Sequence, residues 1–423
     1  MSFMSRLPRP RADSTLDRLV REYFGGGTTS SGVSVNSDNA MRMITVNNCI
    51  RVLFNCVSQM PCQLMKEVDD VKSKAKDHPL YKVISKRPNS FMTAPQLWGL
   101  AIVHVCLRGN FYAFKVKYGN QVREILPIHP DRVLDVTQNA DWSLTYKIAN
   151  VIVQGNNTQI QTQSYKEYSQ DQIFHIRGLS LNGYVGLNPI QYARETIGVG
   201  LASEKFLANY FGQGMHPGAV IKYPQSLDPV THKNLWEAYK LKYGGLKASS
   251  DLMLLDNGMD IAFPTIKLVD AQFLEQMRLT ESQICGLFGV PMILIQAGST
   301  PATFASSLQF KQSFVDFTIA PIAVNFETTI DKDLLTDQDQ DAFYAKYNMG
   351  SLLRGNMAER FAAYAVGITN KFMNANEARS LEDWNKYEGG DVYENPNTST
   401  NTESNKESNA DNGSDDDSSD GGN

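Results

Sequence analysis

Three aspartates at alternate positions, Asp337, Asp339 and Asp341, form the pattern in this sequence that most resembles a metal site. A calcium loop of the helix–loop–helix type opens D-x-D-x-D, because carboxylates at that spacing converge on one cation. Such a loop needs Gly at its sixth position and Glu at its twelfth, but this chain has Ala342 and Asn348 there. Both the sharp turn and the bidentate ligand are missing, so we expect no calcium site.

The six histidines, which could act as general bases, are scattered along the chain. The tripeptide His129-Pro130-Asp131 is typical of co-chaperones when it lies between two helices. Here it follows a strand-like run, so we predict a turn after a strand. His175 lies in the alternating run QIFHIRG, which indicates a packed strand residue.

Motifs for nucleotide or acyl chemistry are also missing. The segment GGLKASS at 244–250 lacks the spacing of a P-loop, and neither G-x-S-x-G nor H-E-x-x-H occurs. Nothing in the sequence assembles a nucleophile, a base and oxyanion donors. We therefore predict that the chain is not an enzyme and uses no cofactor.

The five cysteines lie in apolar segments and form no C-x-x-C pair, which predicts buried, reduced thiols and neither zinc nor disulfides. The basic N-terminus MSFMSRLPRPRADS has no apolar stretch behind it, so we expect no secretory signal. No run of about 18 apolar residues is present, so no membrane span is expected.

The first half of the chain is predicted to be a mixed α+β region. Residues 39–65 show helical spacing of apolar residues up to Pro61, and 89–107 indicate a second buried helix. The run NFYAFKVKY alternates and is followed by Gly119-Asn120 and VREILPI, which predicts a β-hairpin. Further short strands are expected as far as about residue 177.

A compact insert separates two predicted long helices. The first begins at Asn188, a good N-cap, with Pro189 at the first helical position and Gln191 completing a capping box; Gly212 and Gly214 end it. The second spans 270–288, and the residues between them read as short strands and one helix.

An uncharged segment follows, from Ser282 to Phe310, broken by GVP and GSTP. A helix of about thirty residues, 302–335, is predicted after it, with a bend at Pro321. Two short helices come next, with capping boxes at Asn356 with Glu359 and Asn374 with Glu377.

Nine segments in this order resemble the phage portal protein family. They include TVNNCIRVLFNCVSQMPCQLM at 45–65, RGNFYAF at 108–114, LPIHPDRV at 126–133, GYVGLNPIQYARETI at 183–197, FLEQMRLTESQICGLFGVPMILI at 273–295, TIAPIAVNFE at 318–327 and NANEARSLEDW at 374–384. The resemblance covers about residues 43–392.

The resemblance implies an α+β portal fold and a dodecameric ring oligomer. The ranges that it implies are a flexible N-terminal arm 1–39, a wing 40–188, stem helices 189–213 and 270–288, a clip 214–269, a tunnel loop 289–306, a long kinked spine helix with its connection 307–349, a helical crown 350–394 and a disordered acidic tail 395–423.

The function implied by the resemblance is mechanical. The ring would sit at one capsid vertex of the virion, after assembly in the host cytoplasm. The terminase large subunit would dock on it and drive double-stranded DNA through its channel, and the genome would later leave by the same route. Further implied partners are the major capsid protein or scaffold, and head-completion, adaptor and tail proteins.

Two groups of site residues follow from this assignment. The tunnel loop would present Gln296, Ser299, Thr300, Thr303 and Phe304 to DNA, offering polar contact without an ion pair to phosphate. In the clip, the expected docking residues for terminase or adaptor are Lys233, Glu237, Lys240, Lys242 and Lys247.

Two other classes remain open from the sequence. One is a different phage structural protein, such as an adaptor or a capsid component. The other is a DNA-processing or nucleotide-dependent enzyme with an unusual site, which only the mixed α+β content and the scattered polar residues suggest.

The formal net charge of −5 argues against a protein that grips DNA by neutralising phosphates. The acidity is confined to residues 395–423, which carry seven acidic residues and one Lys; the rest carries 39 basic and 38 acidic residues. A nearly neutral body suits a channel that surrounds DNA and lets it slide.

Overall fold

The structure, a computed structural model, divides into two compact units, Met1–Leu352 and Leu353–Asn423. Each unit is described by itself. The described residues are 29–69, 71–154, 157–212, 220–222, 229–230, 233–234, 237, 260–262, 271–295, 304–352, 357–382 and 384–393.

The centre of the first unit is helix α3, Ile44–Gln59, which follows the short helix α2, Ser37–Ala40. Val46, Ile50, Leu53 and Val57 are buried, as the helical spacing predicted. The helix ends before Pro61, which cannot donate a backbone hydrogen bond. The predicted helix and its end before Pro61 are confirmed, but the helix begins at Ile44 and not at Asn39, and residues 62–65 belong to a strand.

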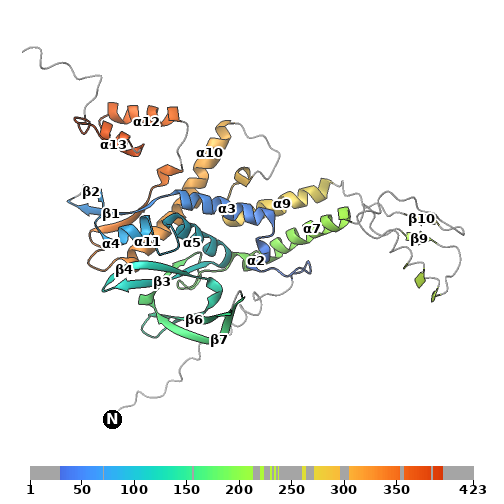
Figure 1. The fold of residues 1–423 in the computed structure, drawn as a ribbon. Helices are drawn as coiled ribbons and strands as arrows, with labels where there is room; N and C mark the ends of the chain where they lie inside the picture. Colours follow the sequence, from blue (N-terminus) through green and yellow to red (C-terminus); the bar gives the residue numbers. More distant parts are fainter. Residues whose placement is uncertain are drawn as a thin grey trace, which may run out of the picture. The chain divides into compact units, whose positions relative to one another are not determined.

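Helix α5, Ala94–Arg108, packs against α3 and is shorter than the predicted 89–107 helix (Figure 1). Asn89 Oδ1 accepts hydrogen bonds from the backbone N–H groups of Phe91 and Met92, at 3.1 and 2.8 Å. This turn holds residues 89–93 outside the helix, which begins at a capping box between Thr93 and Gln96. The predicted start was therefore wrong by five residues.

Gly109 ends α5 in the left-handed region, with φ 76°. A Cβ at this position would lie 1.9 Å from the carbonyl oxygen of Leu187. Glycine is required here both by the backbone conformation and by this close approach.

The predicted hairpin is confirmed as strands β3, Asn110–Tyr118, and β4, Gln121–Ile128, joined at Gly119 with φ 63°. Strand β8, Ile173–Arg177, pairs with β3, giving the order β4-β3-β8. A second antiparallel sheet, β5-β6-β7, is formed by β5, Val133–Gln138, β6, Leu144–Gln154, and β7, Asn157–Ser169. A small core that includes Tyr112, Tyr146 and Ile173 lies between the two sheets.

The 3-10 turn η1, Pro130–Arg132, with His129 as its N-cap, lies directly after β4, so the predicted turn after a strand is confirmed. The related turn η2, Gln170–Gln172, precedes β8.

A third sheet has the order β11-β1-β2, from Cys62–Val68 (β1), Val71–Lys74 (β2) and Phe343–Tyr347 (β11), with helix α4, Pro79–Ser85, packed on β1. Two carboxylates of helix α11, Ala320–Leu334, join this sheet. Glu327 accepts from the N–H of Tyr347 and Asp331 from that of Ala345, each at 2.6 Å.

The helix predicted from Asn188 is interrupted. Asn188 Oδ1 caps it as expected, accepting from the N–H groups of Ile190 and Gln191. However, α6, Pro189–Tyr192, ends at Ala193, and α7 runs over Arg194–Gly212. Helix α9, Ala271–Phe288, agrees closely with the predicted second helix.

The predicted 302–335 helix comprises α10, Phe304–Phe314, a π-helical turn, Val315–Ile319, and α11, Ala320–Leu334. The irregular turn directly precedes Pro321, which lacks the N–H that a regular helix would use. The structure has this π-helical turn directly before Pro321, where the sequence predicted a bend.

One core joins residues from α3, α5, β3, α9 and α11, so segments assigned to wing, stem and spine are packed together. The short turn η6, Met349–Ser351, closes the described part of this unit. No helix in the described part of the chain is long and apolar enough to cross a membrane.

The second unit contains α12, Met357–Thr369, and α13, Ala375–Leu381. The capping box between Asn374 and Glu377 is present as predicted. The box proposed at Asn356 lies partly outside the described residues. Arg360 Nε donates to Glu382 Oε1 at 2.9 Å, which ties the two helices together.

Candidate functional site

Helices α7 and α9 lie side by side, and α9 packs on α3 (Figure 1). Gly200 of α7 permits a close approach, because a Cβ there would lie 2.3 Å from Met43 Cε. On the neighbouring helix, Cys285 Sγ lies 3.9 Å from Cys49 Sγ of α3. The pair that the resemblance assigns as stem helices is thus attached to α3 through α9, while α7 lies against Met43 directly before α3.

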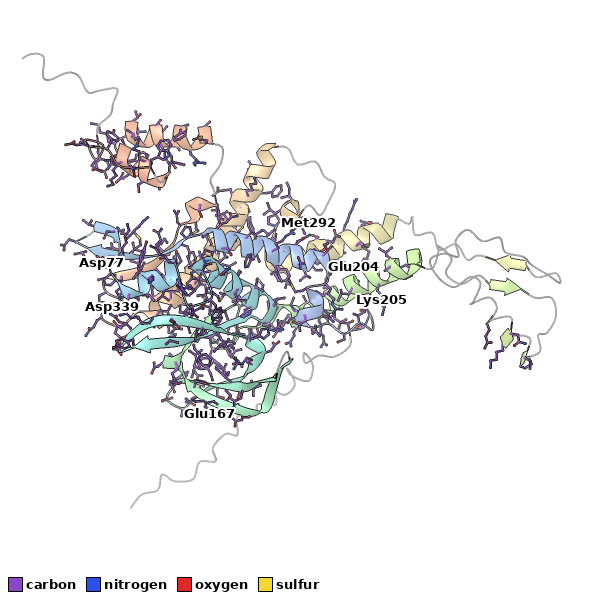
Figure 2. All side chains as sticks on the ribbon, in the orientation of Figure 1. Asp77, Glu167, Glu204, Lys205, Met292 and Asp339 are labelled. Carbon is purple, nitrogen blue, oxygen red and sulfur yellow. The ribbon has the colours of Figure 1, made fainter. Side chains whose placement is uncertain are left out.

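Both helices of this pair carry charged residues, among them the half-buried Glu204 of α7. Figure 2 shows Glu204 and Lys205 next to each other on α7. Burial raises the pKa of Glu204, and Glu281 of the facing helix α9 raises it further.

The insert between the two helices closes on itself. Strand β9, Val220–Lys222, pairs antiparallel with β10, Asp260–Ala262, so residues 38 to 42 positions apart in the sequence become neighbours. Of the predicted docking residues, Lys233 and Glu237 are helical and exposed. Lys240, Lys242 and Lys247 lie outside the described residues.

The residues of the uncharged segment that directly follow α9 have a defined backbone conformation. Gly289 has φ 65°, and the N–H of Val290 donates to the carbonyl oxygen of Cys285 at 2.9 Å. The 3-10 turn η4, Met292–Ile295, follows, with Met292 labelled in Figure 2 and Ile295 buried. Thr318 of the π-helical turn donates its hydroxyl to the Gly289 carbonyl at 2.7 Å.

Of the predicted DNA-facing residues, Gln296, Ser299, Thr300 and Thr303 lie outside the described residues. Phe304 is the first residue of α10. The structure therefore describes both ends of the segment, η4 and α10, and leaves the DNA-contact assignment as a prediction.

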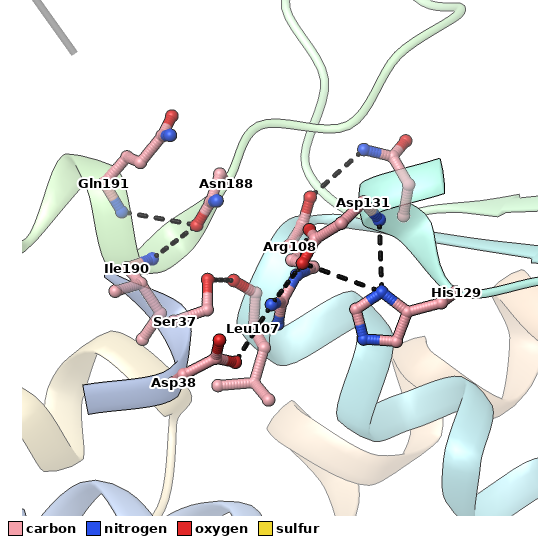
Figure 3. Close-up of polar contacts among 10 residues, drawn as sticks. Ser37, Asp38, Leu107, Arg108, His129, Asp131, Asn188, Ile190 and Gln191 are labelled. Carbon is pink, nitrogen blue, oxygen red and sulfur yellow. Dashed lines mark hydrogen bonds and ion pairs between the residues drawn. The ribbon is translucent and has the colours of Figure 1, made fainter. Parts of the chain in front are cut away.

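A charged junction ties α5 to the N-terminal helix and to the turn after β4 (Figure 3). The Arg108 side chain is 10% exposed and donates to Asp131 Oδ2 at 2.7 Å and to Asp38 Oδ1 at 3.1 Å. Burial alone would raise the pKa of Asp131, but the hydrogen bond and the charge of Arg108 lower it below its ordinary value. Sequence reasoning did not identify this junction.

His175 is a packed residue, as predicted. Its Nδ1 lies 3.2 Å from the Tyr146 hydroxyl and its Nε2 3.0 Å from Asn110 Oδ1. Burial lowers the pKa of His175 well below 6.5, and the positive charge of Arg177 adds to this effect. The imidazole is therefore neutral at physiological pH and serves to connect strands.

All five cysteines are free thiols, and four of them are buried. The contact between Cys49 and Cys285 was not foreseen, since no sequence spacing signals a pair 236 residues apart. In the part of the chain that the structure describes, no three metal-ligating side chains gather into a possible metal site.

Comparison with known proteins supplies the context for this arrangement. The family model described as phage portal protein matches residues 44–383. The portal protein of Enterobacteria phage HK97 is 23% identical over 362 residues, covering 85% of this chain and 82% of that protein. The probable portal protein of Streptomyces phage phiC31 is 22% identical over 365 residues, covering 85% and 79% respectively.

Solved structures share the fold. The neck of the native gene transfer agent particle, computed with C12 symmetry, has a TM-score of 0.52 and 20% identity, covering 88% of this chain and all of that chain. An HK97 family phage portal protein from Corynebacterium diphtheriae has a TM-score of 0.52 and 12% identity, covering 75% and 97%.

The fold and the matches define a structural protein of the virion and not an enzyme. The chain belongs to the phage portal protein family, whose members stand at the capsid vertex as the head-to-tail connector. Portal proteins form ring oligomers, with C12 symmetry seen in the related neck structure.

Proposed function

We propose that this chain assembles into a ring of twelve copies, through which double-stranded DNA enters the capsid during packaging and leaves during ejection. The observation that carries the proposal is the layout of the stem: α7 and α9 pack together, and the inserted strand pair β9–β10 lies between them in sequence. The C12 symmetry of the related neck supports the copy number.

We assign residues 1–39 to an arm, 40–188 to the wing, 189–213 and 270–288 to the stem, and 214–269 to the clip. Residues 289–306 form the tunnel loop, 307–349 the spine and its connection, 350–394 the crown and 395–423 an acidic tail. The clip, with Lys233 and Glu237 exposed, receives the terminase large subunit and later the adaptor or head-completion proteins. The major capsid protein or scaffold is a further partner.

The tunnel loop is proposed to touch DNA without holding it. Residues 282–310 contain no charged side chain. Each ion pair to phosphate would add a sequence-independent binding contribution, repeated by every copy in the ring. Hydroxyl and amide groups can contact DNA while opposing its sliding less than ion pairs to phosphate would.

The proposal is tested by counting copies per virion and by packaging in vitro. Quantitative mass spectrometry should find about twelve copies per particle, as expected for one ring with the symmetry of the related neck. Hundreds of copies would instead indicate a capsid component. Capsids assembled without the protein should fail to protect DNA from nuclease when terminase and ATP are supplied, and the isolated protein should hydrolyse neither ATP nor DNA.

A further inference from the structure

The long helical segment α10–α11 carries large apolar side chains that are exposed in the described part of the first unit. Phe310, Phe317 and Val324 follow one another at seven-residue intervals, and all three are exposed, Phe317 by 80%. We call these three residues the spine face. Phe314 and Ile319, which alternate with them, are buried in the core of the unit.

A helix that packs on a single core needs apolar residues on one side only. Apolar residues on a second side indicate that this side is also buried in a contact. An 80% exposed phenylalanine leaves a large apolar surface in water, which is unfavourable. The spine face therefore has the character of a contact surface.

A second apolar surface surrounds a cavity of about 280 Å³ in the same unit. Leu179, Leu187, Leu287, Pro321 and Ile322 are among its lining residues, and we call them the cavity patch. Leu179 is 79% exposed although it lines the cavity.

The loop that carries Leu179 is held in place by its own hydrogen bonds. The N–H of Leu187 donates to the Leu179 carbonyl at 2.7 Å, and Ser180 Oγ donates to the Val185 carbonyl at 2.6 Å. Asn182 Oδ1 accepts from the N–H groups of Tyr184 and Val185. The exposed leucine is thus presented by an ordered loop.

The two surfaces lie on different sides of α11. Ile322 lines the cavity, and Val324 belongs to the spine face. Two residues along an α-helix turn the side chain by about 200°, so these two point in nearly opposite directions. A symmetric dimer needs one self-complementary surface, whereas a ring needs two different surfaces that match.

We propose that the spine face of one copy packs on the cavity patch of the next copy around the ring. The inference rests on the proposed ring and goes further by naming the matching surfaces. Phe317 has the size and apolar character to occupy the mouth of the neighbour's cavity. A buried aromatic side chain typically removes about 150–250 Å² of surface from water. A second copy of the chain is the partner, because related chains with this fold stand in a neck of C12 symmetry.

Single substitutions test each surface. Phe317→Asp and Leu179→Asp place a charge in the proposed contact and should each reduce the ring fraction in mass photometry at least tenfold. Trp142→Asp is the matched control, because Trp142 is 79% exposed on the turn between β5 and β6, outside both surfaces. Its ring fraction should equal that of the wild type.

Mixing the two variants tests whether the surfaces match each other. Phe317→Asp keeps an intact cavity patch, and Leu179→Asp keeps an intact spine face. Each should be monomeric alone, while their mixture should form heterodimers that cannot grow, because only one good contact remains. Analytical ultracentrifugation should show a dimer in the mixture alone.

Distinct results separate this inference from the ring itself. If the wild type forms rings and Phe317→Asp or Leu179→Asp forms them equally well, the proposed matching of surfaces is wrong although the ring is correct. The same conclusion holds if the mixture of the two variants stays monomeric. A wild type that forms no rings overturns the proposed function. Circular dichroism checks that each variant is folded. Where an aspartate variant unfolds, Phe317→Ala and Leu179→Ala repeat the test, and each should raise the protein concentration needed for ring formation about tenfold. An unchanged concentration overturns the inference.

Discussion

The hydroxyl of Thr318 donates a hydrogen bond of 2.7 Å to the carbonyl oxygen of Gly289, 29 residues earlier in the chain. Gly289 ends α9 with φ 65°, and Thr318 lies in the π-helical turn between α10 and α11. The bond therefore joins the first residue of the proposed tunnel loop to the helical segment that follows the loop.

Thr318→Val should loosen this connection. Valine keeps the branched shape but leaves the Gly289 carbonyl without its donor, so we expect the free energy of unfolding to fall by about 1 kcal/mol. The urea midpoint measures this change. Thr318→Ser retains the hydroxyl and should stay close to the wild type, and equal midpoints for all three proteins would contradict the role of the bond.

Arg108→Leu should destabilise the protein in a pH-dependent way. Arg108 lowers the pKa of Asp131 below 3.8, so the ionised carboxylate stabilises the folded state above that pH, and the contribution disappears as pH falls through the lower folded-state value. We expect a loss of about 1 kcal/mol at pH 7, modest because Asp131 is partly exposed.

The control for this prediction is Arg108→Lys, which keeps the charge and should retain part of the stability. Urea midpoints at pH 7 and pH 3.5 should show the gap between wild type and Arg108→Leu narrowing at the lower pH. A gap of the same size at both values would show that packing alone, and not the ion pair, accounts for the loss.

Asp331→Asn should have the opposite pH dependence. Burial raises the pKa of Asp331 from 3.8 to about 6, and Glu327 adds to the increase. The folded state therefore binds a proton more tightly than the unfolded chain, so protonation stabilises it below pH 3.8 and this advantage is lost as pH rises through about 6.

An asparagine oxygen can still accept from the Ala345 N–H, but it carries no buried charge. We expect Asp331→Asn to gain on the order of 1 kcal/mol relative to wild type at pH 7.5, after discounting for partial exposure, and little at pH 4. Asp337→Asn, which removes an exposed carboxylate nearby, is the control for net charge. A variant that is less stable than wild type at pH 7.5 would contradict the claim that the buried charge of Asp331 destabilises the folded state.

The parts of the fold that depend on local pattern could be predicted. The helix at 44–59 followed from apolar residues at helical spacing, and the β3–β4 hairpin from alternation around Gly119-Asn120. Both signals lie within one element, and the tertiary structure agrees with them.

Parts that depend on a single polar side chain could not. Phe91 and Met92 continue the apolar run of α5, but the Asn89 side chain binds their N–H groups and keeps them out of the helix. The Gly-Val-Pro sequence at 289–291 marks the end of a helix, yet no sequence pattern indicates that Thr318 would reach Gly289. Contacts between distant segments become visible only in the folded structure.

Thr300→Asp and Thr303→Asp test the tunnel-loop assignment. One added carboxylate per copy places a ring of negative charge around the proposed channel, which should repel phosphates and lower the amount of DNA packaged or retained roughly several-fold. Rings should still assemble. Thr300→Asn and Thr303→Asn are uncharged controls, and unchanged DNA filling in the aspartate variants with intact rings would remove the tunnel loop from the DNA path.

The central claim, a portal ring around a DNA channel, is tested most directly by single-particle imaging of the purified full-length protein. The account predicts rings of twelve copies with an open central channel, in keeping with the C12 symmetry of the related neck. A protein that remains monomeric under all solution conditions, with no ring bearing a central channel, would contradict it.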